Sequence, residues 1–192
     1  EYFRCLVNQG AKELTTAKYK DARSTYRLLK RLVDEYDSDT FPRLDFPRTG
    51  ALLVEYRLGA IDAREAARMQ ENIASECDVG DDPFYCENAR AVYLTLSGQP
   101  DVAIVIFDYL DEQLERRSRP APSMQYLIKA NRSAAKYVGG DIEVAQHEWS
   151  ELTELCSQIP YLIRRYLLAR HGALAEVMRK EEARSPVAFD EC

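Results

Sequence analysis

The chain has 192 residues, of which 46% are hydrophobic and 30% charged, and this composition is typical of a globular protein with a substantial core. Its formal net charge of −6 argues against a nucleic-acid binder that depends on phosphate contacts, because such proteins carry a basic face. No apolar run approaches the roughly 20 residues that cross a bilayer, so we expect a soluble protein without a membrane partner.

Apolar residues at spacings of three and four predict four helices, over 2–14, 51–58, 84–96 and 124–138. Sustained alternation of apolar and polar residues is absent, so strands are not expected. Proline-rich or acidic linkers separate the helices into pairs, at 37–49, 78–83 and 118–123. After Pro160, an apolar segment over 161–182 predicts a capping helix, or else a fifth pair interrupted at His171 and Gly172.

The second helix of each pair follows a recurring pattern. In the stretch GDIEVAQHEWSEL, Gly140 ends one helix, and Ala145, Trp149 and Leu152 then lie on one face of the next. The stretch GQPDVAIVIFDYL repeats the order with Gly98, Ala103, Phe107 and Leu110, and an earlier copy reads Ala17, Ala22, Tyr26 and Leu29. We therefore expect Trp149 to be a buried packing residue.

One copy of the pattern is degenerate. Gly59 and Asp62 hold the turn positions, but Arg68 and Glu71 stand where the aromatic residue and leucine are expected. A small local shift restores an apolar face, which consists of Ala63, Ala66, Ala67, Met69 and Ile73.

This order of glycine, acid, alanine and aromatic residue resembles the tetratricopeptide (TPR) repeat over residues 2–158. The period of about 40 residues exceeds the roughly 34 of a TPR unit and is closer to HEAT-type repeats, so a generic helical solenoid is the alternative. The resemblance implies an all-α fold: a right-handed TPR-like helical-hairpin solenoid of about four repeats with a C-terminal capping helix. One domain would span 1–183, and 184–192 would form a loose tail.

Motifs for catalysis or cofactor binding are missing from the sequence, which has no GxxxxGK[ST], GxGxxG, GxSxG, HExxH or CxxC. Glu143 and His147 lie one helical turn apart but lack a third metal ligand, so we expect a surface histidine. The acids at 78, 81 and 82 do not have the spacing of a calcium loop. We predict that the chain is not an enzyme and has no cofactor and no metal site.

Two basic clusters, at 116–119 and 164–165, are interpreted as partners of helix C-termini, with a site for acidic peptide, phosphate or RNA as the alternative. The five cysteines are widely spaced, which favours reduced thiols and a cytoplasmic location. A bridge between Cys77 and Cys86 is left open, because they flank a short loop.

The resemblance also implies a function, since the first helices of successive TPR repeats line a concave groove that receives an extended peptide or a partner helix. By position, the groove-facing residues would be Leu53, Tyr56, Tyr85, Asn88, Val92, Thr95, Leu127, Ala134 and Tyr137. The alternative is that these residues only pack the repeats. The polar clamp that grips a peptide C-terminus in some TPR proteins is not reproduced, so we do not predict that type of ligand.

Three function classes remain. We favour a non-catalytic protein–protein interaction module, whose partner is a protein or peptide or another domain of the same chain. Because the chain begins at Glu1 within a predicted helix, it reads as a piece of a longer protein, which makes a sensing or regulatory arm of a signalling or defence protein the second class. A helical-repeat RNA binder is the third, and the acidity of the chain makes a nucleic-acid partner unlikely.

Overall fold

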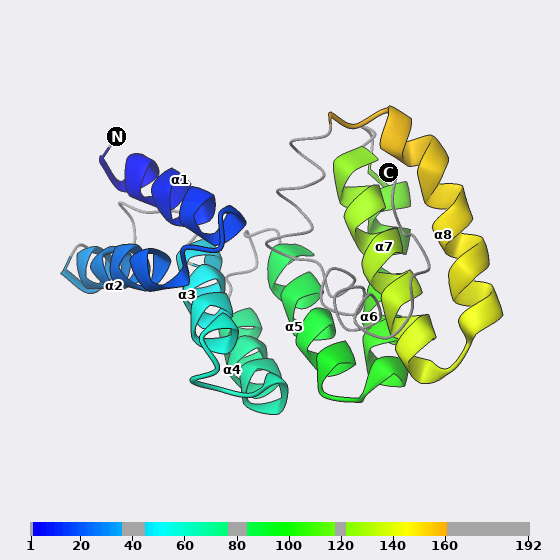
Figure 1. Ribbon diagram of the computed structural model, residues 1–192, viewed down its shortest axis with the longest axis horizontal. Helices are drawn as coiled ribbons and strands as arrows, with labels where there is room; N and C mark the ends of the chain where they lie inside the picture. Colours follow the sequence, from blue (N-terminus) through cyan, green and yellow to red (C-terminus); the bar gives the residue numbers. More distant parts are fainter. Residues whose placement is uncertain (1, 36–44, 77–83, 118–121, 161–192) are drawn as a thin grey trace. The chain divides into compact units, whose positions relative to one another are not determined.

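A computed structural model describes residues 2–35, 45–76, 84–117 and 122–160 (Figure 1). Within these ranges the chain forms eight α-helices and no strand: α1 Tyr2–Thr15, α2 Tyr19–Glu35, α3 Asp45–Arg57, α4 Ala63–Ser75, α5 Phe84–Leu96, α6 Pro100–Glu115, α7 Pro122–Gly139 and α8 Ile142–Ser157. They make four helix pairs, as predicted. The predicted capping helix and tail lie outside the described residues. None of the described helices is both long and apolar enough to span a membrane.

The helix boundaries follow the sequence closely except near proline. α5 begins and ends where the periodicity places it. α3 begins at Asp45, six residues before the predicted start at Ala51, and Pro47 lies in its first turn. Proline is tolerated there because the first N–H groups of a helix have no partner inside it. The same reason lets α7 begin at Pro122.

All four pairs share the same turn, which is the clearest sign of a repeat. A residue with positive φ follows the first helix of each pair, at Ala17, Gly59, Gly98 and Gly140. The N–H of this residue donates to the carbonyl three residues earlier, and the next N–H donates to the carbonyl five residues earlier, at 2.8–3.2 Å in all four copies. This is the Schellman motif, in which glycine is favoured because it has no Cβ. Ala17 is the exception.

The degenerate second pair differs by two extra residues in its turn. α4 begins four residues after the turn residue Gly59, whereas α2, α6 and α8 each begin two residues after theirs. Asp62 caps α4 by accepting a hydrogen bond from the N–H of Glu65 at 2.8 Å. The buried positions therefore move to Ala66 and Gln70, with Gln70 where the other pairs have an aromatic residue.

This register confirms part of the predicted shift and corrects the rest. Ala66 and Ala67 are buried as predicted. Met69, predicted on the same face, is 41% exposed. The prediction for Met69 is wrong because the turn before α4 is longer. This longer turn places Gln70, instead of Met69, on the inner face one helical turn after Ala66.

The chain divides into two compact units, unit 1 (Glu1–Arg90) and unit 2 (Ala91–Cys192), with the boundary inside α5. In unit 1, α2 packs against both α1 and α3, and α3 packs against α4. The fully buried ring of Tyr26 is central to this core, and it fits because two neighbours have no side chain. A Cβ added at Gly10 would lie 3.1 Å from the ring, and one at Gly50 would lie 2.5 Å from it. Both glycines therefore make room for the tyrosine.

In unit 2, α7 packs against both α6 and α8 (Figure 1). The buried side chains of unit 2 include Phe107 and Leu110 of α6, Leu127 and Ile128 of α7, and Leu152 of α8. Trp149, predicted to be buried, is only half-buried. Tyr26 and Phe107, which hold the same repeat position in their pairs, are both buried, so the three copies differ at this position.

Candidate partner-binding site

The predicted groove residues lie on α3, α5 and α7, the first helices of three pairs. Six of them are buried, namely Leu53, Asn88, Val92, Thr95, Leu127 and Ala134. The other three, Tyr56, Tyr85 and Tyr137, are half-buried and keep part of their surface in solvent. Any direct contact between a partner and these positions would therefore involve the tyrosines.

Unit 1 contains a cavity that the sequence did not reveal. It has a volume of about 470 Å³ and lies among α2, α3 and α4. Its lining is mostly apolar and includes Val33, Leu52, Ile61, Met69 and Ile73, with Tyr26 also contributing. Ala51 offers only a methyl group at this point, which leaves space between the helices. Pockets that hold small molecules or anchoring side chains typically measure about 300–1,000 Å³.

Charged side chains surround this cavity. Glu76 pairs with Arg48 at 2.5 Å, and Glu55 accepts hydrogen bonds from Nε and Nη2 of Arg23 at 2.8 and 2.5 Å. The hydrogen bond to Glu55 raises the pKa of Arg23 above its ordinary value. The two carboxylates are thus matched by arginines. Lys30 adds a positive charge to the lining.

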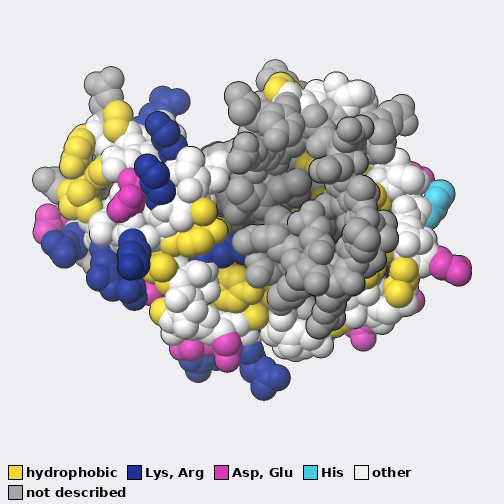
Figure 2. Space-filling model, viewed as in Figure 1, with side chains coloured by type: hydrophobic (Ala, Val, Ile, Leu, Met, Phe, Trp, Pro, Cys, Tyr) yellow, Lys and Arg dark blue, Asp and Glu magenta, His cyan; other side chains and the backbone are white. Residues whose placement is uncertain are grey.

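A row of cations runs along the solvent side of α2. Lys20, Arg27 and Arg31 are exposed and lie seven and four residues apart, so they share one face. Figure 2 shows Lys and Arg side chains gathered over α1 and α2 of unit 1. Residues 2–35 hold eight lysines and arginines and four acidic residues, although the whole chain has a net charge of −6. Sequence reading missed this row because helical spacing separates its members.

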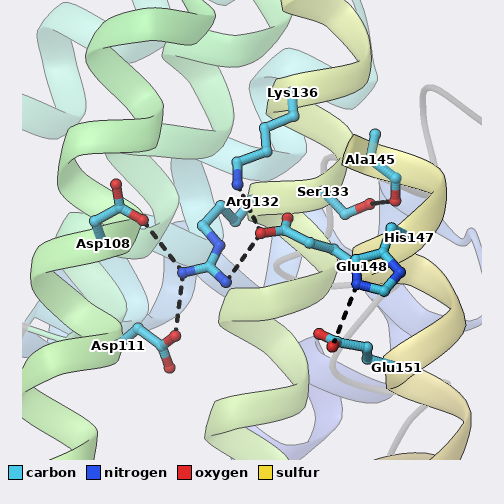
Figure 3. Close-up of polar contacts among 9 residues, drawn as sticks. All are labelled: Asp108, Asp111, Arg132, Ser133, Lys136, Ala145, His147, Glu148 and Glu151. Atoms are coloured by element: carbon cyan, nitrogen blue, oxygen red, sulfur yellow. Dashed lines mark hydrogen bonds and ion pairs between the residues drawn. The ribbon is translucent and has the colours of Figure 1, made fainter. Parts of the chain in front are cut away.

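Unit 2 instead buries a group of charges between its helices (Figure 3). Arg132 of α7 lies 3.2 Å from both Asp108 and Asp111 of α6 and 3.1 Å from Glu148 of α8. Lys136 of α7 also binds Glu148, at 2.6 Å. The side chain of Arg132 is only 18% exposed. One guanidinium therefore connects three helices.

The packing of these charges leaves some polar atoms unsatisfied. Nε of Arg132, Oδ1 of Asp111 and Oε2 of Glu148 are buried and have no hydrogen-bond partner among the described residues. Burial raises the pKa of the Asp111 carboxyl, while the positive charge of Arg132 opposes this rise. The arrangement can hold helices together, but its charged atoms face each other rather than an open site.

The remaining residues that the sequence analysis considered for metal binding, disulfide formation or anion binding are as follows. His147 is exposed, as predicted, and lies 3.8 Å from Glu151. Across the described part of the chain, no three His, Cys, Asp or Glu side chains are grouped so as to hold a metal ion. Cys86 is a buried thiol, and Cys77, the acidic loop at 78–82, Arg119 and the cluster at 164–165 lie outside the described residues. Arg116 pairs with Glu112 at 2.6 Å near the end of α6.

Comparison with known proteins identifies the fold. Neither a protein-family model nor a curated protein sequence matches the chain. Among solved structures, it is similar to PlcR of Bacillus thuringiensis, crystallised in complex with the peptide PapR7 and DNA, with a TM-score of 0.72 and 18% sequence identity. The match covers 95% of this chain and 65% of the PlcR chain. This likeness and the hydrogen-bond pattern that the four turns share confirm a TPR-like repeat fold, which is all-helical over the described residues.

Proposed function

We propose that the chain is a non-catalytic protein–protein interaction module that holds an extended peptide or a helix of a partner protein in a groove between its helices. The observation that carries this proposal is the fold: its structural neighbour PlcR was crystallised with a peptide. Stacked helical hairpins form long surfaces that suit an extended ligand. No reaction is part of the proposal.

The half-buried tyrosines are the proposed contact residues. Tyr85 packs edge-on against Phe84, with ring centroids 5.4 Å apart, and the guanidinium of Arg57 lies 6.0 Å from the ring of Tyr56. Such contacts hold an aromatic ring in place before a partner arrives. A fixed tyrosine loses little conformational freedom on binding, and this is one reason why tyrosine is frequent among residues that dominate binding energy. The buried members of the predicted set would shape the groove beneath.

The test is to change Tyr85 and Tyr137 to Ser together, and to measure the melting temperature and the retention of partners in a pulldown. We expect loss of the partner with little change in melting temperature. Tyr109→Ser, which alters an exposed tyrosine on the second helix α6, is the matched control and should retain the partner. Unfolding of the double variant, or unchanged retention of every partner, would show that these tyrosines only pack the repeats.

A second candidate is the sensing or regulatory arm of a larger protein. It is favoured by the neighbour, because PlcR was crystallised with both a peptide and DNA and its match to this chain covers only 65% of its length. Under this proposal, a bound peptide would change the activity of a connected domain. The full reading frame that contains this sequence would decide between the candidates, since an adjoining effector domain favours the second and an isolated repeat domain favours the first.

A further inference from the structure

We infer that the cavity among α2, α3 and α4 of unit 1, together with the cation row of α2, is a binding site for an extended acidic peptide with one bulky apolar anchor residue. This inference rests on the proposed function, because it names a ligand class for a peptide-binding module. It adds a site separate from the tyrosines of the predicted groove.

The cavity accepts an apolar side chain. Its volume of about 470 Å³ exceeds that of any single amino-acid side chain, and its lining is mainly apolar. Met69 is 41% exposed in this lining although it is a large apolar residue. Transfer of a leucine or phenylalanine side chain from water into such an apolar space is favourable. An anchor residue would therefore gain free energy by covering Met69 and its neighbours.

Asn72 provides the group that a peptide backbone needs. It lines the cavity and is exposed on α4, and its side-chain amide makes no hydrogen bond within the described residues. An asparagine amide has both a donor and an acceptor, so it can pair with one N–H and one carbonyl of an extended strand. The anchor would thus enter the cavity while its own backbone is held at the entrance.

The charge distribution selects an acidic ligand. Glu55 and Glu76 at the cavity are already matched by Arg23 and Arg48, so these carboxylates do not repel an anion strongly. Lys30 lies at the cavity and belongs to α2, the same helix whose outer face carries Lys20, Arg27 and Arg31. An apolar anchor in the cavity would place one flanking carboxylate near Lys30, and the extended chain would then turn around α2 so that its further carboxylates reach the row. The apolar cavity argues for a peptide rather than a nucleic acid as the occupant.

The experiment measures fluorescence anisotropy with a short fluorescein-labelled peptide that has one central phenylalanine and two glutamates on each side. We expect saturable binding by the 192-residue chain. A matched peptide with glycine in place of phenylalanine, and another with lysines in place of the glutamates, should each bind at least about tenfold more weakly. Raising the salt from about 0.05 to 0.5 M should weaken binding, because exposed charges are then screened.

Two variants locate the site on the chain. Ala51→Trp fills the cavity and Arg27→Glu with Arg31→Glu reverses the cation row, and each should weaken binding about tenfold or more. Ala60→Trp, at an exposed turn residue outside the cavity, and Arg116→Glu with Arg117→Glu, at two exposed arginines of unit 2, are the matched controls and should bind normally. If Ala51→Trp lowers the melting temperature, Met69→Trp fills the same space from a partly exposed position and replaces it.

The outcomes separate this inference from the proposed function. Absence of peptide binding, or binding that neither variant alters, overturns the inference, while the pulldown with the tyrosine variant still tests the interaction module independently. Tight binding of a labelled oligouridylate that the acidic peptide does not compete for would also overturn it. In that case the cation row would be a nucleic-acid site.

Discussion

Units 1 and 2 are built from the same helical hairpin but place their charges in opposite ways. In unit 1 the ion pairs Arg23–Glu55 and Arg48–Glu76 remain partly exposed, the row on α2 faces solvent, and a cavity is left among three helices. In unit 2 Arg132 lies between α6, α7 and α8 and satisfies carboxylates from two of them. The comparison teaches that helical hairpins with the same turn can support either an exposed row of charges beside a cavity or a packing in which ion pairs connect the helices.

The difference has an energetic meaning. Exposed ion pairs contribute about 0–1 kcal/mol each, because water and salt screen them. Removal of one member of a buried group costs several times more, because the remaining charges are then unpaired in a poorly solvated place. The pairs of unit 1 therefore add little to its stability, whereas the charges of unit 2 help to fix the positions of three helices.

The largest expected effect compares one repeat position in the two units. Tyr26→Ala should lower the free energy of unfolding by about 3–5 kcal/mol, because its ring is fully buried between Gly10 and Gly50. Trp149→Ala should cost about 1–2 kcal/mol, since Trp149 is only half-buried and its removal exposes a smaller cavity. Urea denaturation of both variants provides the measurement. Equal losses would mean that Trp149 contributes as much to packing as the fully buried Tyr26.

The second prediction concerns the arginines. Arg132→Ala should cost about 3 kcal/mol, because the largely buried Asp111 would lose the guanidinium that pairs with it and Glu148 would keep only Lys136. Arg23→Ala, the matched change in unit 1, should cost less than about 1 kcal/mol, because its pair with Glu55 is partly exposed. Thermal or chemical denaturation of the two variants measures both losses in stability. The comparison between the units fails if Arg23→Ala proves the more damaging change.

The pattern of residues predicted the repeat well because it reports local physics. The turn residues and the alanines Ala22, Ala103 and Ala145 could be placed from spacing alone, since helix ends and helix faces depend on nearby residues. The register of α4 required one further fact, the capping of its first turn by Asp62. Without it, Met69 was placed on the inner face.

The candidate sites could not be predicted in the same way, because they depend on distances between helices. The spacing of apolar residues places Leu53 and Leu127 on the first helices of their pairs, but it does not tell which face of each helix the neighbouring helices cover. In the structure both leucines are buried. The charge group of unit 2 joins Asp108, Arg132 and Glu148 from three helices, and nothing local connects them. The cavity likewise exists only where three helices meet.

The third prediction uses the turns that the two units share. Ala17 has φ +56°, a left-handed conformation that costs an L-residue about 1–2 kcal/mol, and its side chain is exposed. Ala17→Gly should therefore raise the free energy of unfolding of unit 1 by about 0.5–1 kcal/mol, after the greater freedom of glycine in the unfolded chain is subtracted. Gly140→Ala makes the reverse change in unit 2 and should lower stability by a similar amount. Denaturation curves that show both changes as neutral would mean that these turns relax.

The last and smallest predicted effect is a pH dependence of the free energy of unfolding that comes from the buried carboxyl group of Asp111 in unit 2. Because burial raises the pKa of Asp111, the folded protein binds the proton of this carboxyl more readily than the unfolded chain does. Between the unfolded value, about 3.9, and the higher folded value, the native state therefore holds more protons, so this group makes the protein less stable as pH rises. Above the folded value the carboxyl is ionised in both states, and the loss stays constant.

Asp111→Asn removes this dependence, because the amide does not ionise. We expect the free energy of unfolding of the variant, relative to the parent, to increase from about pH 4 until the folded pKa is passed and then to level off. The remaining carboxylates, Asp108 and Glu148, still pair with Arg132 in the variant. Asp101→Asn, at an exposed position of the same helix, controls for the loss of one negative charge from α6. A variant that instead loses stability relative to the parent as pH rises would show that the attraction of Arg132 outweighs the burial of Asp111, and that the charge group of unit 2 gains from every carboxylate it contains.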